Sequence, residues 1–321
     1  MKPRHLPSAP DPGRAAASPP SRSRRLWDSD LLDDFLHSPT ALLAAVVALL
    51  FLVGALLAPW LAPQNPSNLA LLDLADSHLP PAWLPDGRAA YPLGTDDQGR
   101  DILSALLYGT RLSLTVGVSS VLLSGLIGVA AGLVAGFSGG LIDAVLMRVC
   151  DAMLSFPPIL VALLIDGVGR AIFPQARDVL AVAVLILALT LTDWVRYARL
   201  VRGSTLVERN KEYVQAARLL GLPRWRLLRR HVLPNVLGPV LVLATLQVGQ
   251  AILAEATLSY LGVGLPATNP SLGTLVRIGN DFLYAGEWWI TLFPGAALVL
   301  IAVSVNLLGD WLRDALNPRL R

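Results

Sequence analysis

The stretch YVQAARLLGLPRWRLLRRHVLPN, residues Tyr213–Asn235, decides how this chain is interpreted. It is strongly basic, yet it separates two apolar segments that are each long enough to cross a membrane. Its first half has the composition of a helix that stops at Gly221, because Gly takes the left-handed C-terminal conformation without a Cβ penalty. Pro223 is preorganised to start a second helix. The stretch therefore predicts two short helices joined by a tight turn, held between two membrane spans.

The composition is that of a protein with several membrane spans. Of the 321 residues, 54% are hydrophobic and 15% are charged, and the mean hydropathy is +0.57. Soluble domains carry roughly 25% charged residues, so this chain has too little polar surface to cover a water-soluble globule. The net charge of +3 gives no reason to expect nucleic acid as a partner. The single cysteine, Cys150, excludes internal disulfides and Cys-based zinc sites.

The N-terminal region differs from the rest of the chain. Residues 1–39 are rich in Pro, Ser and Arg and show no apolar periodicity. They predict a disordered cytoplasmic tail with a short interfacial turn around Leu26–Leu36. This polar region is too long for the start of a cleaved signal peptide, so the apolar run that follows is expected to stay as an anchor.

Six segments approach the length of about 20 apolar residues that a membrane-spanning helix needs. We therefore predict an all-α integral membrane protein whose transmembrane domain is residues 40–321. The third and fourth spans are the weakest, because acidic residues flank both closely, and Pro157–Pro158 predicts a kink in the third. The predicted spans are Thr40–Leu61, Leu112–Phe137, Ala144–Ile165, Val179–Val195, Gly238–Leu258 and Trp288–Leu308.

The positions of Lys and Arg predict the orientation. Most of the 26 Lys and Arg residues fall in the tail, in the segment after the fourth span and at the C-terminus. Cytoplasmic segments carry such an excess, so both termini and the loop at about 203–237 are expected inside. Trp60 and Trp288 then lie at the outer interface, as in an aromatic belt.

The second span carries two local signals. Thr95 and Gln98 predict a capping box before the helix that returns the chain to the membrane. Small residues recur at every fourth position further on, which lets another backbone approach closely. They predict a packing seam, within the subunit or with a partner, in preference to chance scatter in an Ala/Gly-rich helix. The stripe consists of Ser120, Ser124, Gly128, Gly132 and Gly136.

Sequence motifs for catalysis give little reason to expect an enzyme. Neither lysine follows the glycines of a P-loop, and the four histidines form no H-E-x-x-H pair. Residues Gly136–Gly140 fit the esterase pattern G-x-S-x-G, but that motif needs a strand-to-helix turn and this one joins two membrane helices. We predict no catalytic, cofactor or metal site on this chain, and ATP hydrolysis on a partner.

Ionisable and amide side chains inside the predicted spans are candidates for a transport pathway, because such groups usually face a bundle interior or an aqueous cavity. Arg148 and Asp151, three residues apart, either form an ion pair near the cytoplasmic interface or line a pathway. Glu255 lies near the outer end of the fifth span, with Gln247 and Gln250 nearby. A substrate gate and a hydrogen bond between helices are equally open roles for it.

The basic stretch resembles the EAA loop of ABC importer membrane subunits. The family pattern is E-A-A, three residues, Gly, nine residues, then an apolar residue or His before x-L-P. This chain keeps the spacing and replaces the leading Glu with Gln. In the family, this loop contains the coupling helix, which docks in a groove on the ATPase. The resemblance implies that the coupling residues are Gln215, Ala216, Ala217, Gly221, Pro223, Arg224, Trp225, His231, Leu233 and Pro234.

Three further segments, Tyr91–Leu114, Ala254–Gly262 and Gly309–Leu320, resemble dipeptide, oligopeptide and nickel permeases of the DppC/OppC type, and the resemblance covers Ala41–Arg321. It implies the fold of a type I ABC importer permease in a bacterial inner membrane, with both termini cytoplasmic. The implied partners are a second permease subunit, two cytoplasmic ATPases that carry ATP and Mg, an extracytoplasmic substrate-binding protein and membrane lipid. The cargo, whether dipeptide, oligopeptide, nickel or glutathione, is left open.

Three other interpretations compete with a coupling role. In the first two, the basic loop would be a DNA-binding helix-turn-helix or a solvated loop without a partner. Neither interpretation explains the spacing from Gly221 to Pro234. In the third interpretation, the whole chain would be a self-sufficient secondary transporter or channel. This alternative predicts uptake that follows an ion gradient and needs no ATPase.

Overall fold

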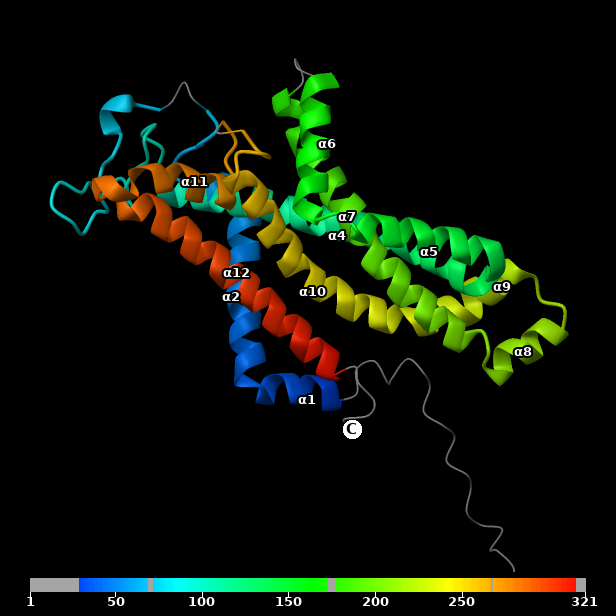
Figure 1. Cartoon of the computed structure of the whole chain (residues 1–321). Coiled ribbons are helices and arrows are strands. Elements are labelled where there is room, and N and C mark those ends of the chain that lie inside the picture. The colour runs from blue at the N-terminus through cyan, green and yellow to red at the C-terminus, as the bar shows by residue number, and fades with distance from the viewer. Residues whose placement is uncertain (1–28, 69–71, 173–176, 267, 316–321) are drawn as a thin grey trace, which may run out of the picture.

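The computed structural model describes residues 29–68, 72–172, 177–266 and 268–315. Long helices cross in a slanting bundle, with α8 and α9 at one end and α11 beside residues 72–101 at the other (Figure 1). The helices are α1 (Ser29–His37), α2 (Pro39–Leu56), α3 (Ala58–Leu61), α4 (Ile102–Ser138), α5 (Gly140–Leu154), α6 (Pro158–Ile172), α7 (Arg177–Glu208), α8 (Glu212–Leu219), α9 (Arg224–Leu227), α10 (Leu233–Tyr260), α11 (Leu272–Phe282) and α12 (Trp288–Ala315), with a π-helical turn η4 (Leu228–Val232) and 3-10 turns η2 (Leu74–Asp76) and η5 (Leu283–Ala285).

Five of the described helices are long and apolar enough to span a membrane: α2, α4, α7, the continuous helix from α9 to α10, and α12. The predicted third span, Ala144–Ile165, is not one continuous helix. It consists of α5 and α6, which meet at a bend of 88° and make a sixth span only if taken together. The kink predicted at Pro157–Pro158 is therefore confirmed, because prolines lack the N–H that would continue the helix of α5. In Figure 1, α6 projects away from the bundle.

The helix of the second span begins earlier than predicted. It starts at Ile102, and Asp101 is its N-cap, since the Asp101 carboxylate accepts a hydrogen bond of 2.8 Å from the N–H of Ser104. The predicted capping box is wrong: the Thr95 hydroxyl instead donates to the backbone oxygen of Asp76 over 2.6 Å. Thr95 thus links two parts of the segment 72–101. The cap of α4 is a carboxylate directly before its first turn.

The small-residue stripe forms a seam between α4 and α7, as predicted for packing within the subunit. A Cβ atom added to Gly128 would lie 2.4 Å from the backbone oxygen of Trp194. One added to Gly132 would lie 2.5 Å from that of Ala198, and one on Gly136 would lie 2.7 Å from the Cβ of Thr205. The two backbones approach so closely that only glycine fits between them.

The N-terminal region is only partly described. Residues 1–28 of the predicted tail lie outside the described part of the chain, and so does the start of the predicted interfacial turn. The helix α1, Ser29–His37, lies within the segment expected to be disordered and corrects its boundary. The Phe35 ring packs edge-on against Trp311, with ring centroids 4.9 Å apart, and this contact ties α1 to the end of α12.

The end of the bundle opposite α8 and α9 is a folded cap formed by residues 72–101, α11 and the start of α12. The imidazole Nδ1 of His78 lies 2.6 Å from Glu287 Oε2, and the indole of Trp289 donates to the Thr95 backbone oxygen over 3.2 Å. Arg100 is completely buried and pairs with Asp96 over 2.6 Å. The sequence patterns did not predict α11, which packs against α4 and α12 at this end of the bundle.

Candidate functional site

The spacing of the basic stretch corresponds to a sharp reversal between α8 and α9. Gly221 has φ +77°, and its N–H donates to the backbone oxygen of Arg218 over 3.1 Å. The N–H of Leu222 donates to the oxygen of Ala217 over 3.3 Å. These bonds close the end of α8 in the way a left-handed C-terminal glycine allows. Pro223 lies directly before α9, at its N-cap. The sequence placed it one position later, as the first residue of the helix.

One face of this α8–α9 unit is fixed to the bundle. Val214, Ala217, Leu227 and Val232 are buried in one apolar cluster with residues of α4, α7 and α10. Burial of each of the larger of these apolar side chains stabilises the folded protein by about 1.5–3 kcal/mol. The turn is therefore mechanically attached to the helices of the membrane domain.

The other face of the unit points outward. Leu219 and Leu220 are 89% and 82% exposed, Trp225 is 58% exposed, and Ala216 is exposed as well. Apolar side chains so exposed at one place commonly mark an interaction surface. We call Ala216, Leu219, Leu220, Arg224 and Trp225 the outward face.

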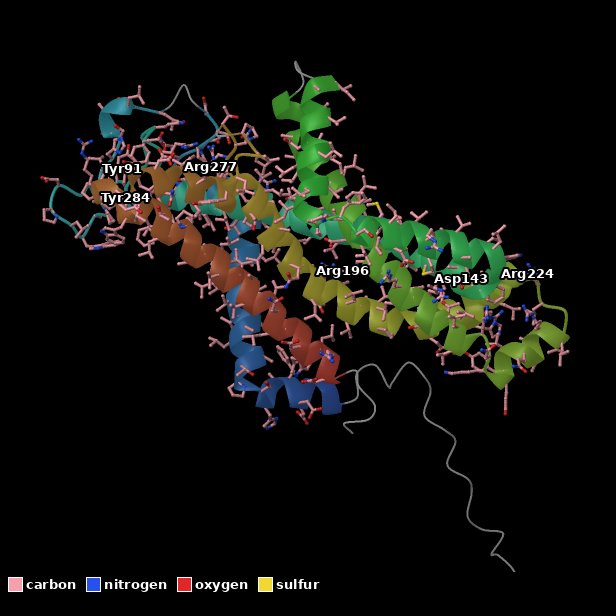
Figure 2. All side chains as sticks on the ribbon, in the orientation of Figure 1. Tyr91, Asp143, Arg196, Arg224, Arg277 and Tyr284 are labelled. Atoms are coloured by element: carbon pink, nitrogen blue, oxygen red, sulfur yellow. The ribbon has the colours of Figure 1, made fainter. Side chains whose placement is uncertain are left out.

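Arginine side chains border the outward face. The Arg226 guanidinium lies over the Trp225 ring, 5.3 Å from its centroid. Trp225, Arg226, Arg229 and Arg230 line a shallow depression of about 340 Å³. Figure 2 shows Arg224 at the same end of the molecule. A surface that joins exposed apolar groups to positive charge suits a partner groove with acidic edges.

The α9–α10 connection is a continuous helix, whereas the sequence predicted a junction between loop and span. The π-helical turn η4 joins α9 to α10, and the combined helix runs from Arg224 to Tyr260. Pro234 is exposed at the second position of α10, and Leu233 is half-buried before it. A displacement of α9 therefore acts directly on the helix that crosses the membrane.

A polar clamp holds this connection to α7. The Tyr213 hydroxyl donates to the Glu208 carboxylate and accepts a bond of 2.8 Å from the Asn235 side chain. Asn235 also donates to the His231 backbone oxygen over 2.8 Å. Partial burial, with the Glu208 carboxylate beside it, raises the pKa of Tyr213 to about 12. The clamp joins α7, α8 and α10 at one point, and the ring of His231 packs near Tyr213.

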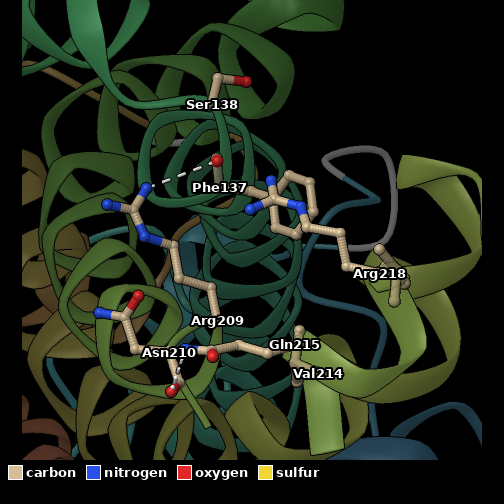
Figure 3. Close-up of a pocket in the computed structure, with 8 residues that line it drawn as sticks. Phe137, Ser138, Arg209, Asn210, Val214, Gln215 and Arg218 are labelled. Carbon is tan, nitrogen blue, oxygen red and sulfur yellow. Dashed lines mark hydrogen bonds between the residues drawn. The ribbon is translucent and has the colours of Figure 1, made fainter. Parts of the chain in front are cut away.

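Gln215 occupies a polar pocket between α8 and the end of α4 (Figure 3). The pocket measures about 290 Å³. The Gln215 amide donates to the Asn210 backbone oxygen over 3.0 Å, Arg209 donates to the Gly136 oxygen over 2.6 Å, and Arg218 lies over the Phe137 ring. The neutral Gln215 therefore shares this pocket with two guanidinium groups.

The predicted pair of Arg148 and Asp151 is not the pair that forms. The Asp151 carboxylate accepts a bond of 2.5 Å from Arg199 on α7, while Arg148 lies exposed on α5. Arg199 is distant in the sequence, so helix spacing alone could not identify it. The contact joins α5 to α7 near the bent part of the third span.

The sequence left two roles open for Glu255, a substrate gate and a hydrogen bond between helices. In the structure, Glu255 forms hydrogen bonds between helices. It is completely buried, and it accepts bonds of 2.6 Å from Ser113 on α4 and 2.7 Å from Ser259. The Ser113 hydroxyl also accepts from the N–H of Leu272, at the start of α11, over 3.4 Å. Glu255 thus connects three helices and is closed off from any open surface of the described chain.

Gln247 and Gln250 belong to a different polar group from Glu255. Gln247 is buried and accepts a bond of 2.9 Å from Arg196, whereas Gln250 is exposed. Gln250 lines a pocket with Asp193 and Arg196, two residues that the sequence analysis did not propose. Their signal was present, because both charges fall within the apolar helix α7.

The family model described as the binding-protein-dependent transport system inner membrane component matches residues 128–321. The chain belongs to this family. A second model, the N-terminal transmembrane domain of oligopeptide transport permease C, matches residues 26–81. The predicted family is confirmed, and the chain is a membrane-spanning transport subunit of an ABC importer and not an enzyme.

Relatives match the chain over almost its full length. It is 38% identical to the di/tripeptide transport system permease protein DppC of Pseudomonas aeruginosa, covering 100% of this chain and 99% of that protein. It is 37% identical to the dipeptide transport system permease protein DppC of Haemophilus influenzae, covering 89% and 93%. The oligopeptide transport system permease protein OppC of Bacillus subtilis is 35% identical, covering 94% and 92%.

The fold has a counterpart among solved structures. A chain from inward facing conformations of the MetNI methionine ABC transporter aligns with a TM-score of 0.54 and 20% sequence identity. The alignment covers 67% of this chain and 98% of that one. It confirms the predicted permease fold, and with the family membership it sets aside the self-sufficient secondary transporter.

Proposed function

We propose that this chain is one of two unlike permease subunits in an ATP-driven importer of short peptides. The observation that carries the proposal is the similarity, over 89% or more of the chain, to proteins named as dipeptide and di/tripeptide permeases in two bacteria. The other subunits are a second permease, two cytoplasmic ATPases that bind ATP and Mg, and an extracytoplasmic peptide-binding protein. The complex lies in the inner membrane.

The α8–α9 unit transmits ATPase closure to the membrane helices in this proposal. Three features support that role: the outward face is apolar and bordered by arginines, the opposite face is packed on α4, α7 and α10, and α9 continues into α10. A groove on an ATPase that closes on α9 would move α10 as a rigid lever, since packed helices shift as units. His231, Leu233 and Pro234 form the lever's attachment.

Reconstitution of the assembled complex tests the import function. Proteoliposomes that contain all subunits should take up a labelled dipeptide only with ATP and the binding protein. This chain reconstituted alone should show no uptake, even with an imposed proton or sodium gradient. Saturable uptake by the isolated chain under such a gradient would contradict the proposal, and ATP-driven transport of other solutes but not of peptides would contradict the peptide part alone.

The proposed orientation places both termini and the α8–α9 unit in the cytoplasm, and α11 and residues 62–101 outside. Two exposed positions at opposite ends of the bundle test it: Tyr284, which is 97% exposed, and Leu219. In a Cys150→Ser background, an impermeant thiol reagent should label Tyr284→Cys in intact spheroplasts and Leu219→Cys only after lysis. The reverse pattern would invert the topology.

A further inference from the structure

The pocket beside the bent third span contains charged groups of α7, a helix long and apolar enough to span the membrane. It has a volume of about 90 Å³, and Thr192, Asp193, Arg196 and Gln250 provide its polar lining. Asp193 and Arg196 lie near the middle of α7, and α10 contributes Gln250 (Figure 2 labels Arg196). Apolar residues of α6 and α10 complete the wall, among them Pro158, the first residue after the break. Charges at this depth usually face an aqueous cavity or pathway.

The Arg196 guanidinium is held in place and still has free donors. Its Nη1 donates to Gln247 Oε1 over 2.9 Å and lies 3.7 Å from Asp193 Oδ1, too far for a hydrogen bond. A guanidinium carries five N–H groups. Within the described part of the chain Gln247 is its one partner at hydrogen-bond distance, and 46% of the Arg196 side chain is exposed.

Buried polar groups around Arg196 are also incompletely bonded. The Gln247 side-chain nitrogen is buried, and its one near partner among the described residues is the Asp193 carboxylate. The Tyr197 hydroxyl, one turn along α7 from Asp193, is buried and has no hydrogen-bond partner among the described residues. Buried polar groups in native proteins are nearly always satisfied, so such a cluster indicates a place where another molecule supplies the partner.

We propose that this pocket is the subsite for the carboxylate terminus of a short peptide in transit. The Arg196 guanidinium and the Gln250 amide donate to the carboxylate, and Gln247 and Asp193 are positioning residues that hold Arg196 toward the opening. The volume fits a chain end rather than a whole peptide, since it equals that of roughly three waters. The proposal rests on peptide import as the function of the complex.

Protection of a thiol inside the pocket tests the subsite directly. Ala254 lines the pocket and is small, so Ala254→Cys in a Cys150→Ser background reports access without removing a proposed ligand. In the purified complex, with and without ATP, a dipeptide at ten times its Kd should slow labelling about tenfold. The same dipeptide with an amidated C-terminus should protect little, and the N-acetylated dipeptide should still protect.

Two variants on the same helix separate binding from general damage. Arg196→Gln should abolish protection by the free dipeptide, because it removes the charged donor to the carboxylate. Arg199→Gln is the matched control: its side chain is also 46% exposed on α7, but it pairs with Asp151 and does not line the pocket. Protection should persist in that variant.

Several results would overturn the subsite. These are a cysteine at 254 that never labels, protection that is lost on N-acetylation instead of amidation, equal protection by acetate, or protection unchanged by Arg196→Gln. ATP-driven dipeptide uptake by the wild-type complex, measured first, distinguishes these failures from a failure of the proposed function. If uptake is present and protection absent, only the subsite is wrong.

Discussion

Gly132 in the seam and Gly221 in the α8–α9 turn are required for opposite physical reasons. At Gly132 the backbone is an ordinary helix, and a Cβ would lie 2.5 Å from the Ala198 oxygen. At Gly221 nothing lies within 4 Å of an added Cβ, but the backbone has φ +77°. The first glycine is fixed by lack of space and the second by backbone direction. The seam thus determines whether the bundle assembles, and the turn determines where α9 points.

The largest expected effect is therefore at the seam. Gly132→Val should destabilise the folded subunit by about 3 kcal/mol or more, because α4 and α7 must separate to admit the side chain. Size-exclusion chromatography of a fluorescent fusion should show most of the protein as aggregate or degraded. Gly203→Val on α7 is the control, since nothing lies within 4 Å of a Cβ there. Equal monodisperse yields for Gly132→Val and Gly203→Val would contradict the claim that lack of space in the seam requires glycine at position 132.

The next effect is at the turn, and it should spare the fold. Gly221→Val places a β-branched residue at positive φ, which costs about 2 kcal/mol and favours a redirected chain. The subunit should still enter the membrane and elute as a folded species, while ATPase co-purification and uptake are lost. Gly221→Asn should keep both, because Asn tolerates the left-handed region. Normal coupling in the valine variant would remove the turn from the proposed mechanism.

The two glycines also show how far the sequence alone could predict this molecule. The seam stripe and the left-handed turn were both predictable, because each is a local pattern with a direct physical cause. The kink at Pro157–Pro158 was predictable for the same reason, but its size of 88° depends on what α6 packs against. Sequence spacing carries no such information.

Contacts between distant segments account for most of what the sequence missed. Asp151 was expected to pair with its helix neighbour and pairs with Arg199 instead, because α5 and α7 are brought together by the fold. The pocket around Arg196 needs three helices and could not be assembled from one. Glu255 illustrates the intermediate case: the sequence identified a functional or structural polar group, and the structure showed that its partners are serines of α4 and α10.

A smaller effect is expected where the turn connects to the membrane. Pro234 has no N–H to bond a carbonyl in the turn before it, and the π-helical turn η4 lies there. Pro234→Ala should allow η4 to tighten toward ordinary α-helix, which alters how a movement of α9 is passed on to α10. Uptake should fall severalfold while ATPase co-purification stays near wild type. An equal loss of both would make Pro234 a docking residue and not part of the lever.

The smallest effect should come from the charge in the turn, at Gln215. The amide shares its pocket with the Arg209 and Arg218 guanidinium groups, so Gln215→Glu adds a carboxylate next to two positive charges. Since the position is exposed, such a contact should strengthen the attachment of α8 by only about 0.5 kcal/mol, and salt should weaken the gain. Thermal unfolding of the complex at low and high ionic strength measures it, with Gln215→Met as the uncharged control. The expected result is a slightly higher midpoint for Gln215→Glu at low salt and no difference at high salt. A gain that persists at high salt would contradict an electrostatic origin. A loss of stability would show that the bond from the Gln215 amide to the Asn210 oxygen outweighs the new charge contacts.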